Sequence, residues 1–155
     1  MQATEFLKFF DHFPQFKKHF KGIFSIDTLP TKIGYRKFLI CNTDTQSGEG
    51  KHWIIFGQSE KNSIELFDSL GITEEKKQLL REHCKFEKRQ LIFNTTAFQD
   101  SNSSSCGLFA LYFLIERMFN LDLDFEEILQ LIFDSDISKN EKLVLDFVKN
   151  IETNS

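Results

Sequence analysis

Cysteine is scarce in this sequence, and its spacing excludes two common roles. The three cysteines, Cys41, Cys84 and Cys106, lie far apart in 155 residues, and no Cys-x-x-Cys pair occurs. An odd number of widely spaced cysteines favours free thiols in a reducing compartment over a disulfide framework. His83 beside Cys84 supplies too few ligands for a zinc site, so we expect neither a metal nor another cofactor.

The chain also lacks a long apolar run and an excess of positive charge. No apolar stretch reaches the length of a membrane span, so no membrane partner is expected. Glu5, Lys8 and Asp11 interrupt the apolar residues at the N-terminus, which is not a signal-peptide pattern. The net charge of −4 argues against a general nucleic-acid binder. Short basic clusters at 17–21 and 85–89 have acidic neighbours and are interpreted as solvated surface.

What the chain does contain is enough apolar material for one core. With 41% hydrophobic and 27% charged residues, it has the composition of a single globular domain over residues 1–155. Phenylalanine is unusually frequent, at 19 residues against two tyrosines and one tryptophan, and is expected to fill core positions. Phenylalanines recur every three or four positions in residues 3–20, which predicts an amphipathic helix that breaks or kinks near Pro14.

Local patterns predict the remaining elements. Residues 21–31 are expected to form a connector, and apolar runs predict strands at 35–42, 52–56, 63–67 and 90–95. The first three of these strands indicate an antiparallel meander. Further helices are expected at 73–83, 106–119, 124–133 and 142–151. The predicted fold class is α+β, with a mostly antiparallel sheet packed around a central buried helix.

Two details of these helices matter for the site. In the helix at 73–83, Thr73 is the expected N-cap, and the run Glu74-Glu-Lys-Lys77 is interpreted as a solvated face. In the helix at 106–119, residues 108–115 carry no charge, so this helix must be buried on all sides.

Cys106 stands where a polar loop enters this apolar helix. If one of the serines at 103–105 caps the helix, Cys106 lies in the first turn. There the free backbone N–H groups and the helix dipole favour a thiolate, which is the nucleophilic form. The alternative interpretation is a core cysteine that happens to begin a helix.

A cysteine nucleophile needs a base, and the base needs a group that orients it. His52 begins one predicted strand and Asp68 follows the next, so a hairpin would bring both to the same end of the sheet. Asp68 would then fix the tautomer of His52, and protonated His52 would favour the thiolate. Alternatively, His52 is an ordinary strand-end residue and Asp68 an ordinary turn residue.

The loop before Cys106 carries two candidates for stabilising an oxyanion. Gln99 lies seven positions upstream, and its amide can hydrogen-bond a developing oxyanion together with the backbone N–H of Cys106. Asn102 is a competing candidate for the same role. A solvated loop side chain is the alternative for Gln99.

Three blocks of sequence surround these residues. They are Asn42-Thr43 with Lys51-His52-Trp53-Ile54-Ile55-Phe56, then Ile64-Glu-Leu-Phe-Asp68-Ser-Leu-Gly71, then Gln99-Asp-Ser-Asn102-Ser-Ser-Ser-Cys106-Gly-Leu-Phe109 with Tyr112-Phe-Leu114. The blocks resemble the adenovirus maturation proteases, the adenain family, within the Ulp1-like clan of cysteine proteases. The third block is the most specific, because both its Gln-to-Cys spacing and its Cys-Gly-Leu-Phe run fit. With a weaker likeness at Phe20-Lys-Gly22-Ile-Phe24, the resemblance covers roughly residues 20–115.

The resemblance implies a cysteine endopeptidase that cleaves capsid or virion precursor proteins after small residues, often at Gly-Gly or Gly-x-Gly sites. By the same resemblance, Cys106 is the nucleophile, His52 the base and then the acid, and Asp68 the residue that orients His52. Gln99 and the Cys106 amide form the oxyanion hole, and Trp53 packs beside the histidine as a secondary candidate for substrate contact. We expect a monomer in the virion and the host cell interior, in the cytoplasm or nucleus.

Several features depart from the adenain pattern. Asp68 stands where adenain has glutamate, although aspartate is usual in Ulp1-type relatives. Adenain is basic and is activated by DNA and by a disulfide-linked viral peptide, whereas this chain is acidic, which argues against nucleic-acid activation. A peptide activator is left open, with Cys84 as the candidate thiol and a buried, inert thiol as the alternative. The compact length is similar to that of proteases from virophages and Polinton-type elements.

Two other functions stay open at this point. A deconjugating protease for SUMO-like or ubiquitin-like modifiers would use the same chemistry and the same Gly-Gly preference on a different partner. An inactive binding module would retain the fold alone, and the presence of all four catalytic-type residues argues against it.

Overall fold

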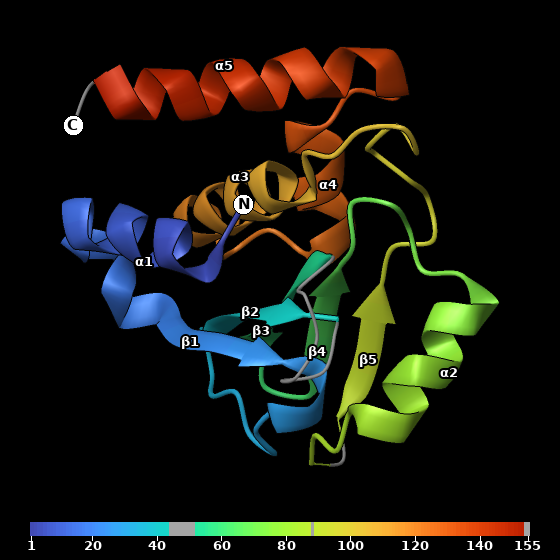
Figure 1. The fold of residues 1–155 in the computed structure, drawn as a ribbon. Coiled ribbons are helices and arrows are strands. Elements are labelled where there is room, and N and C mark those ends of the chain that lie inside the picture. The colour runs from blue at the N-terminus through green and yellow to red at the C-terminus, as the bar shows by residue number, and fades with distance from the viewer. Residues whose placement is uncertain (44–51, 88, 154–155) are drawn as a thin grey trace.

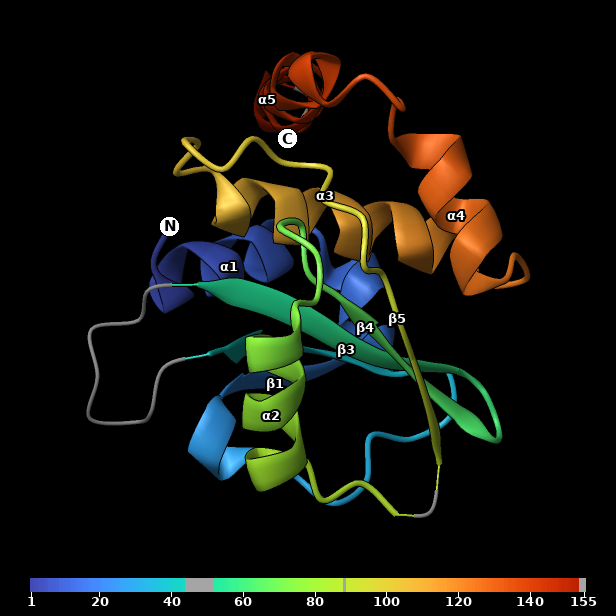
Figure 2. The ribbon, with the colours of Figure 1, turned by 90° about the vertical axis from the view of Figure 1, so that its right-hand side faces the viewer.

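The computed structural model describes residues 1–43, 52–87 and 89–153, and its centre is a five-stranded sheet with helices on both faces (Figures 1 and 2). One face carries α1 (Ala3–His12), α3 (Cys106–Phe119), α4 (Phe125–Ile132) and α5 (Asn140–Thr153). The opposite face carries α2 (Glu74–His83). This arrangement confirms the α+β class. Within the described ranges, no helix is both long and apolar enough to cross a membrane.

The sheet places its strands in sequence order. They are β1 (Phe20–Ser25), β2 (Phe38–Asn42), β3 (Trp53–Glu60), β4 (Ser63–Phe67) and β5 (Gln90–Phe93). Strands β2, β3 and β4 form the predicted antiparallel meander, while β1 is parallel to β2 and β5 is parallel to β4. Because β3 and β4 are antiparallel neighbours, the start of β3 and the end of β4 lie at the same end of the sheet.

The strands are apolar on both faces because each face has its own core. In β2, Phe38 and Ile40 belong to the larger cluster under α1, α3, α4 and α5, whereas Leu39 and Cys41 belong to the smaller cluster under α2. This division follows from the alternation of side chains along a strand. A sheet that is covered on both faces explains why β3 reads as a continuous apolar run.

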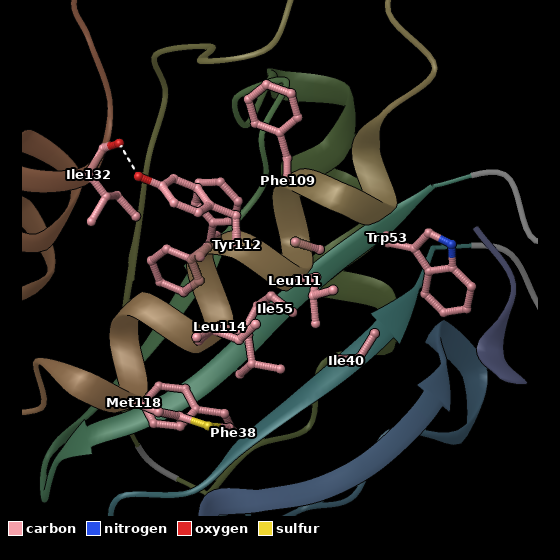
Figure 3. Packing of buried hydrophobic residues seen from close by; sticks show 14 of the residues in the cluster. Phe38, Ile40, Trp53, Ile55, Phe109, Leu111, Tyr112, Leu114, Met118 and Ile132 are labelled. Carbon is pink, nitrogen blue, oxygen red and sulfur yellow. Dashed lines mark hydrogen bonds between the residues drawn. The ribbon is translucent and has the colours of Figure 1, made fainter. Parts of the chain in front are cut away.

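Helix α3 lies between the sheet and α5 and is buried around nearly its whole circumference, as its sequence predicts. Figure 3 shows Leu111 and Leu114 on the side of the helix that faces the sheet, near Ile55. On another side, the hydroxyl of Tyr112 donates a hydrogen bond of 2.6 Å to the carbonyl of Ile132 in α4. The helix is therefore a rigid base for the residue at its first position.

Among the predicted elements, three in or beside the sheet differ in part from the structure. The helix predicted for residues 3–20 ends at His12, and Pro14–His19 form a 3-10 helix, in agreement with the predicted break near Pro14. The connector predicted for 21–31 contains the edge strand β1, whose apolar alternation is interrupted by Gly22 at φ +144° and a register shift. Strand β3 continues past its predicted end to Glu60, because its pairing with β4 runs through an irregularity after Gly57.

Candidate active site

Cys106 is the first residue of α3, as predicted, and its side chain is partly exposed. Ser105 is the N-cap residue, but its hydroxyl does not cap the helix. Instead, the hydroxyls of Ser103 and Ser105 both donate to the carboxylate of Glu141 in α5, the former at 2.7 Å to Oε2. These serines therefore tie the loop that delivers Cys106 to the C-terminal helix, a contact that the sequence patterns did not indicate.

His52 and Asp68 meet at the end of the sheet where β3 begins and β4 ends. The ring Nε2 of His52 lies 2.7 Å from Oδ1 of Asp68, and the two side chains are 14% and 1% exposed. The side chain of Cys106 lies close enough to the His52 ring for each group to shift the pKa of the other. Because Nε2 is engaged by Asp68, Nδ1 is the ring nitrogen that remains for the thiol. The structure thus brings together sulfur, imidazole and carboxylate in one row.

The backbone of Asp68 is fixed from the neighbouring edge strand. The side chain of Asn94, just after β5, accepts from the backbone N–H of Asp68 at 3.1 Å and donates to its carbonyl at 2.7 Å. The backbone N–H of Leu70 donates to the carboxylate oxygen Oδ1 at 2.9 Å. These three bonds hold the carboxylate in its direction toward His52 independently of the histidine itself.

A lysine that the sequence analysis placed on a solvated face contacts the second oxygen of Asp68. Lys76 Nζ lies 2.9 Å from Oδ2 of Asp68 and also donates to the carbonyl of Gly71 at 3.0 Å. The contact follows from the turn after Asp68, where Gly71 adopts φ +79° and the chain doubles back into α2. A Cβ at position 71 would lie 2.5 Å from the carbonyl oxygen of Thr95, so this turn requires glycine.

The protonation states of the three residues support one another. Burial lowers the pKa of His52, but its hydrogen bonds and charge interactions with Asp68 and Cys106 outweigh burial and raise this pKa to about 9. Burial raises the pKa of Cys106, and the hydrogen bond to His52 and a backbone hydrogen bond from Trp53 bring it below its ordinary value. The pKa of Asp68 is likewise lowered, against its burial, by His52 and Lys76. Around neutral pH, this geometry favours a thiolate–imidazolium pair beside an ionised carboxylate.

Gln99 is buried, and both ends of its amide group make hydrogen bonds within the protein. Its Oε1 accepts a 2.6 Å bond from the hydroxyl of Ser69, and its Nε2 donates to the carbonyl and the hydroxyl of Ser103 at 3.0 and 3.2 Å. The side chain thus fastens the loop before Cys106 to the turn after β4. The competing candidate, Asn102, is exposed on the same loop.

Trp53 follows His52 and points its indole into the core beside α1. The indole N–H donates to the carbonyl of Met1 at 2.9 Å, and the ring packs edge-to-face on Phe6 with centroids 5.0 Å apart. Figure 3 shows the ring nitrogen directed at the N-terminal segment. At 6% exposure, the residue leaves little surface for a substrate. The backbone of Trp53, by contrast, helps to lower the pKa of Cys106.

The pKa values of the other two cysteines are raised, whereas that of Cys106 is lowered. Cys41 is fully buried in β2, and burial raises its pKa well above the ordinary range. Burial also raises the pKa of Cys84, to about 11. Both thiols are therefore protonated where Cys106 is ionised, and the state of Cys84 fits the alternative of an inert thiol.

Two solved structures are similar to this chain. The crystal structure of the ASFV pS273R protease aligns with a TM-score of 0.53 and 16% identity, covering 94% of this chain and 67% of that one. A structure of AvrA with IP6 and CoA aligns with a TM-score of 0.50 and 18% identity, covering 86% of this chain and 52% of that one. The chain thus spans about half the length of AvrA, and at these identities the likeness concerns the fold alone.

The sequence comparison carries the classification further. Residues 37–144, which include His52, Asp68, Gln99 and Cys106, match the family described as the Ulp1 protease family, C-terminal catalytic domain. The protein is therefore a cysteine protease. It belongs to the Ulp1 protease family, which confirms the clan suggested by the resemblance of its sequence blocks. No curated protein matches the chain in sequence.

Proposed function

We propose that the protein is a cysteine endopeptidase that uses Cys106 as nucleophile, His52 as base and acid, and Asp68 to orient His52. The observation that carries this proposal is the 2.7 Å bond between His52 Nε2 and Asp68 Oδ1, with Cys106 near enough to the same ring to raise its pKa. Because this bond engages Nε2, Nδ1 is the ring nitrogen that is left for the thiol. The pKa shifts of the pair, up for His52 and down for Cys106, follow from the same contacts.

The reaction proceeds in two halves. The Cys106 thiolate adds to the carbonyl carbon of the scissile peptide bond, and the negative charge passes to the carbonyl oxygen. As the tetrahedral intermediate collapses, the imidazolium of His52 gives its proton to the leaving amine and a thioester remains. Neutral His52 then removes a proton from water, the hydroxide adds to the thioester, and collapse releases the carboxylate product and restores the thiolate–imidazolium pair.

The oxyanion needs donors near the first turn of α3. The backbone N–H of Cys106, at the start of the helix, is one such donor. Gln99 is the second, and in this role its Nε2 exchanges the 3.2 Å bond to the Ser103 hydroxyl for a bond to the oxyanion. The Ser103 hydroxyl retains its bond to Glu141 in that event.

The substrates proposed are capsid or virion precursor proteins that are cut after small, glycine-type residues. The resemblance of the three sequence blocks to adenains supports this choice, and the shared fold of the ASFV pS273R protease is compatible with it. The proposed setting is the virion and the host cell interior, with the protein acting as a monomer. A deconjugating protease for SUMO-like or ubiquitin-like modifiers is the second candidate, because the match to the Ulp1 family favours it equally.

The decisive experiment compares Cys106→Ala with the wild type and with Cys84→Ala on three substrates. These are capsid precursor proteins from the same genome, a SUMO fusion and a ubiquitin fusion. We expect Cys106→Ala to abolish cleavage while circular dichroism and the thermal midpoint stay close to those of the wild type, and Cys84→Ala to retain activity. Full turnover by Cys106→Ala would place the nucleophile elsewhere. Cleavage of a fusion in preference to every precursor would select the second candidate.

A further inference from the structure

The carboxylate of Asp68 is contacted by positive groups at both of its oxygens. Oδ1 faces His52 and also accepts from the backbone N–H of Leu70, whereas Oδ2 faces only Lys76 among the contacts of the described residues. Lys76 comes from the first turn of α2, an element that contributes no other group to the row of catalytic-type residues. The sulfur, the ring, the carboxylate and the ammonium therefore form a line of four groups.

This ion pair differs from an ordinary pair on a helix surface. The Asp68 side chain is 1% exposed and that of Lys76 is 29% exposed, and the ammonium is held in place by a second bond to the Gly71 carbonyl. The next residue, Lys77, pairs with Glu74 in the same turn, but that carboxylate is 82% exposed. An exposed pair of this kind contributes little, whereas a charge-assisted bond to a buried carboxylate acts at low dielectric.

We propose that Lys76 is a positioning residue of the active site, whose ammonium group holds the second oxygen of Asp68 and moderates the field that this carboxylate exerts on His52 and Cys106. The inference rests on the proposed function, since it assigns Lys76 a role in the same reaction. Lys76 touches neither the thiol nor the imidazole, so its effect passes through Asp68.

Within residues 1–43, 52–87 and 89–153, few charged groups lie around the row, and their charges give the sign of the effect. His52, at the start of β3, and Lys76, in α2, face Asp68, while the neighbouring Asn94 is neutral. Cys106 from α3 faces His52, and the amino group of Met1 acts on Cys106 from a greater distance. Loss of the Lys76 ammonium removes one positive charge from this set and leaves Asp68 held by Leu70 and Asn94.

Loss of the ammonium should raise two pKa values, that of His52 and that of Cys106. Without the ammonium, the full charge of Asp68 acts on His52, so the imidazolium keeps its proton to higher pH. The Cys106 thiolate loses a stabilising positive charge, so it also forms at higher pH. We call the titration of the Cys106 thiol the acid limb and that of the His52 imidazolium the alkaline limb. We expect the midpoints of both limbs to rise by about 0.5–1 pH unit in Lys76→Met. A purely structural defect would reduce the fraction of protein that reacts, without moving the midpoints of both limbs.

The experiment follows two titrations between pH 4 and pH 11. The rate at which iodoacetamide alkylates Cys106, followed by mass spectrometry of the Cys106 peptide, gives the acid limb, where the thiolate forms. NMR of the His52 ring gives the alkaline limb, where the imidazolium loses its proton. The proteins are the wild type, Lys76→Met, Lys76→Arg as the variant that keeps the charge, and Lys77→Met as the matched loss of a neighbouring lysine. We expect both limbs to rise in Lys76→Met alone, with the other two within about 0.3 unit of the wild type. Thermal midpoints within a few degrees of one another establish that all four are folded.

The proposal is overturned if the limbs of Lys76→Met coincide with those of the wild type, or if Lys76→Arg moves as far as Lys76→Met. Alkylation requires the thiolate but no substrate, so the result does not depend on finding the right peptide. A wild type that alkylates at low pH yet cleaves none of the tested proteins would count against the proposed function while leaving the test of Lys76 intact. A wild-type Cys106 that alkylates only near pH 9, like an ordinary thiol, would refute both.

Discussion

Two buried carboxylates of one hairpin strand are used in opposite ways. Glu65 lies in β4 and Asp68 directly follows it, and they are 3% and 1% exposed. Glu65 accepts two 2.9 Å bonds from the guanidinium of Arg117, which is itself fully buried in α3. Asp68 instead binds His52 and Lys76, which are 14% and 29% exposed.

The difference lies in the partners, because burial and ion pairing are common to both. The Glu65–Arg117 pair joins β4 to the end of α3, and neither group reaches solvent. The partner of Asp68 is an imidazole whose protonation changes with pH and which reaches both solvent and a thiol. A buried carboxylate therefore indicates a functional site when its partner can exchange a proton with a third group.

The largest effect that would separate the two pairs is expected from His52→Ala. Removing the imidazole takes away both the charge that stabilises the thiolate and the proton donor for the leaving amine, so kcat/KM should fall by about 10³-fold or more. His83→Ala, at the end of α2, is the control and should retain activity. Peptide hydrolysis at pH 7 provides the measurement, and a loss of less than tenfold would remove His52 from the proposed mechanism.

The next effect concerns stability at the other carboxylate. Arg117→Met leaves the charge of Glu65 buried without its partner, which should lower the free energy of unfolding by about 3–5 kcal/mol. The double variant Glu65→Leu with Arg117→Met removes both charges and should recover much of this loss. Urea unfolding measures both. A loss of less than about 1 kcal/mol in the single variant would mean that water reaches the pair.

The active-site row was predictable because its members stand at the ends of locally recognisable elements. Two apolar runs joined by a short polar turn define the hairpin of β3 and β4, and the antiparallel pairing alone brings His52 and Asp68 to one end. The polar-to-apolar junction defines the start of α3 and so places Cys106. Local patterns and one pairing rule place these three residues, and the resemblance to the adenain family supplies their expected roles.

The supporting contacts were not predictable in the same way, because they depend on how distant elements return to the site. Lys76 reaches Asp68 through the turn at Gly71, and Glu141 reaches the serine loop only once α5 lies over α3. Asn94 contacts Asp68 because β5 pairs in parallel with β4 after a crossover, which no local pattern specifies. Gln99 was predicted as a free donor, yet the loop folds so that Ser103 occupies its amide group.

The smallest predicted loss of activity, and the sharpest contrast between the two carboxylates, comes from Asp68→Asn. The thiolate–imidazolium pair survives through the contact of Cys106 with His52, so kcat/KM should fall by only about ten- to hundredfold. Without the negative charge of Asp68, only Cys106 opposes the effect of burial at His52, so the pKa of His52 falls below about 9. The alkaline limb of the pH profile should therefore move down, opposite in sign to the shift expected for Lys76→Met.

Glu65→Gln is the matched control for this change, because it removes a carboxylate of equal burial from the same strand region. It leaves the Arg117 guanidinium without its counter-charge and should reduce stability while the limbs of the profile stay in place. An NMR titration of the His52 ring in both variants makes the comparison directly. Equal shifts in the pKa of His52 in the two variants would show that both buried carboxylates act on His52 alike. Asp68 would then have no specific effect on the imidazole.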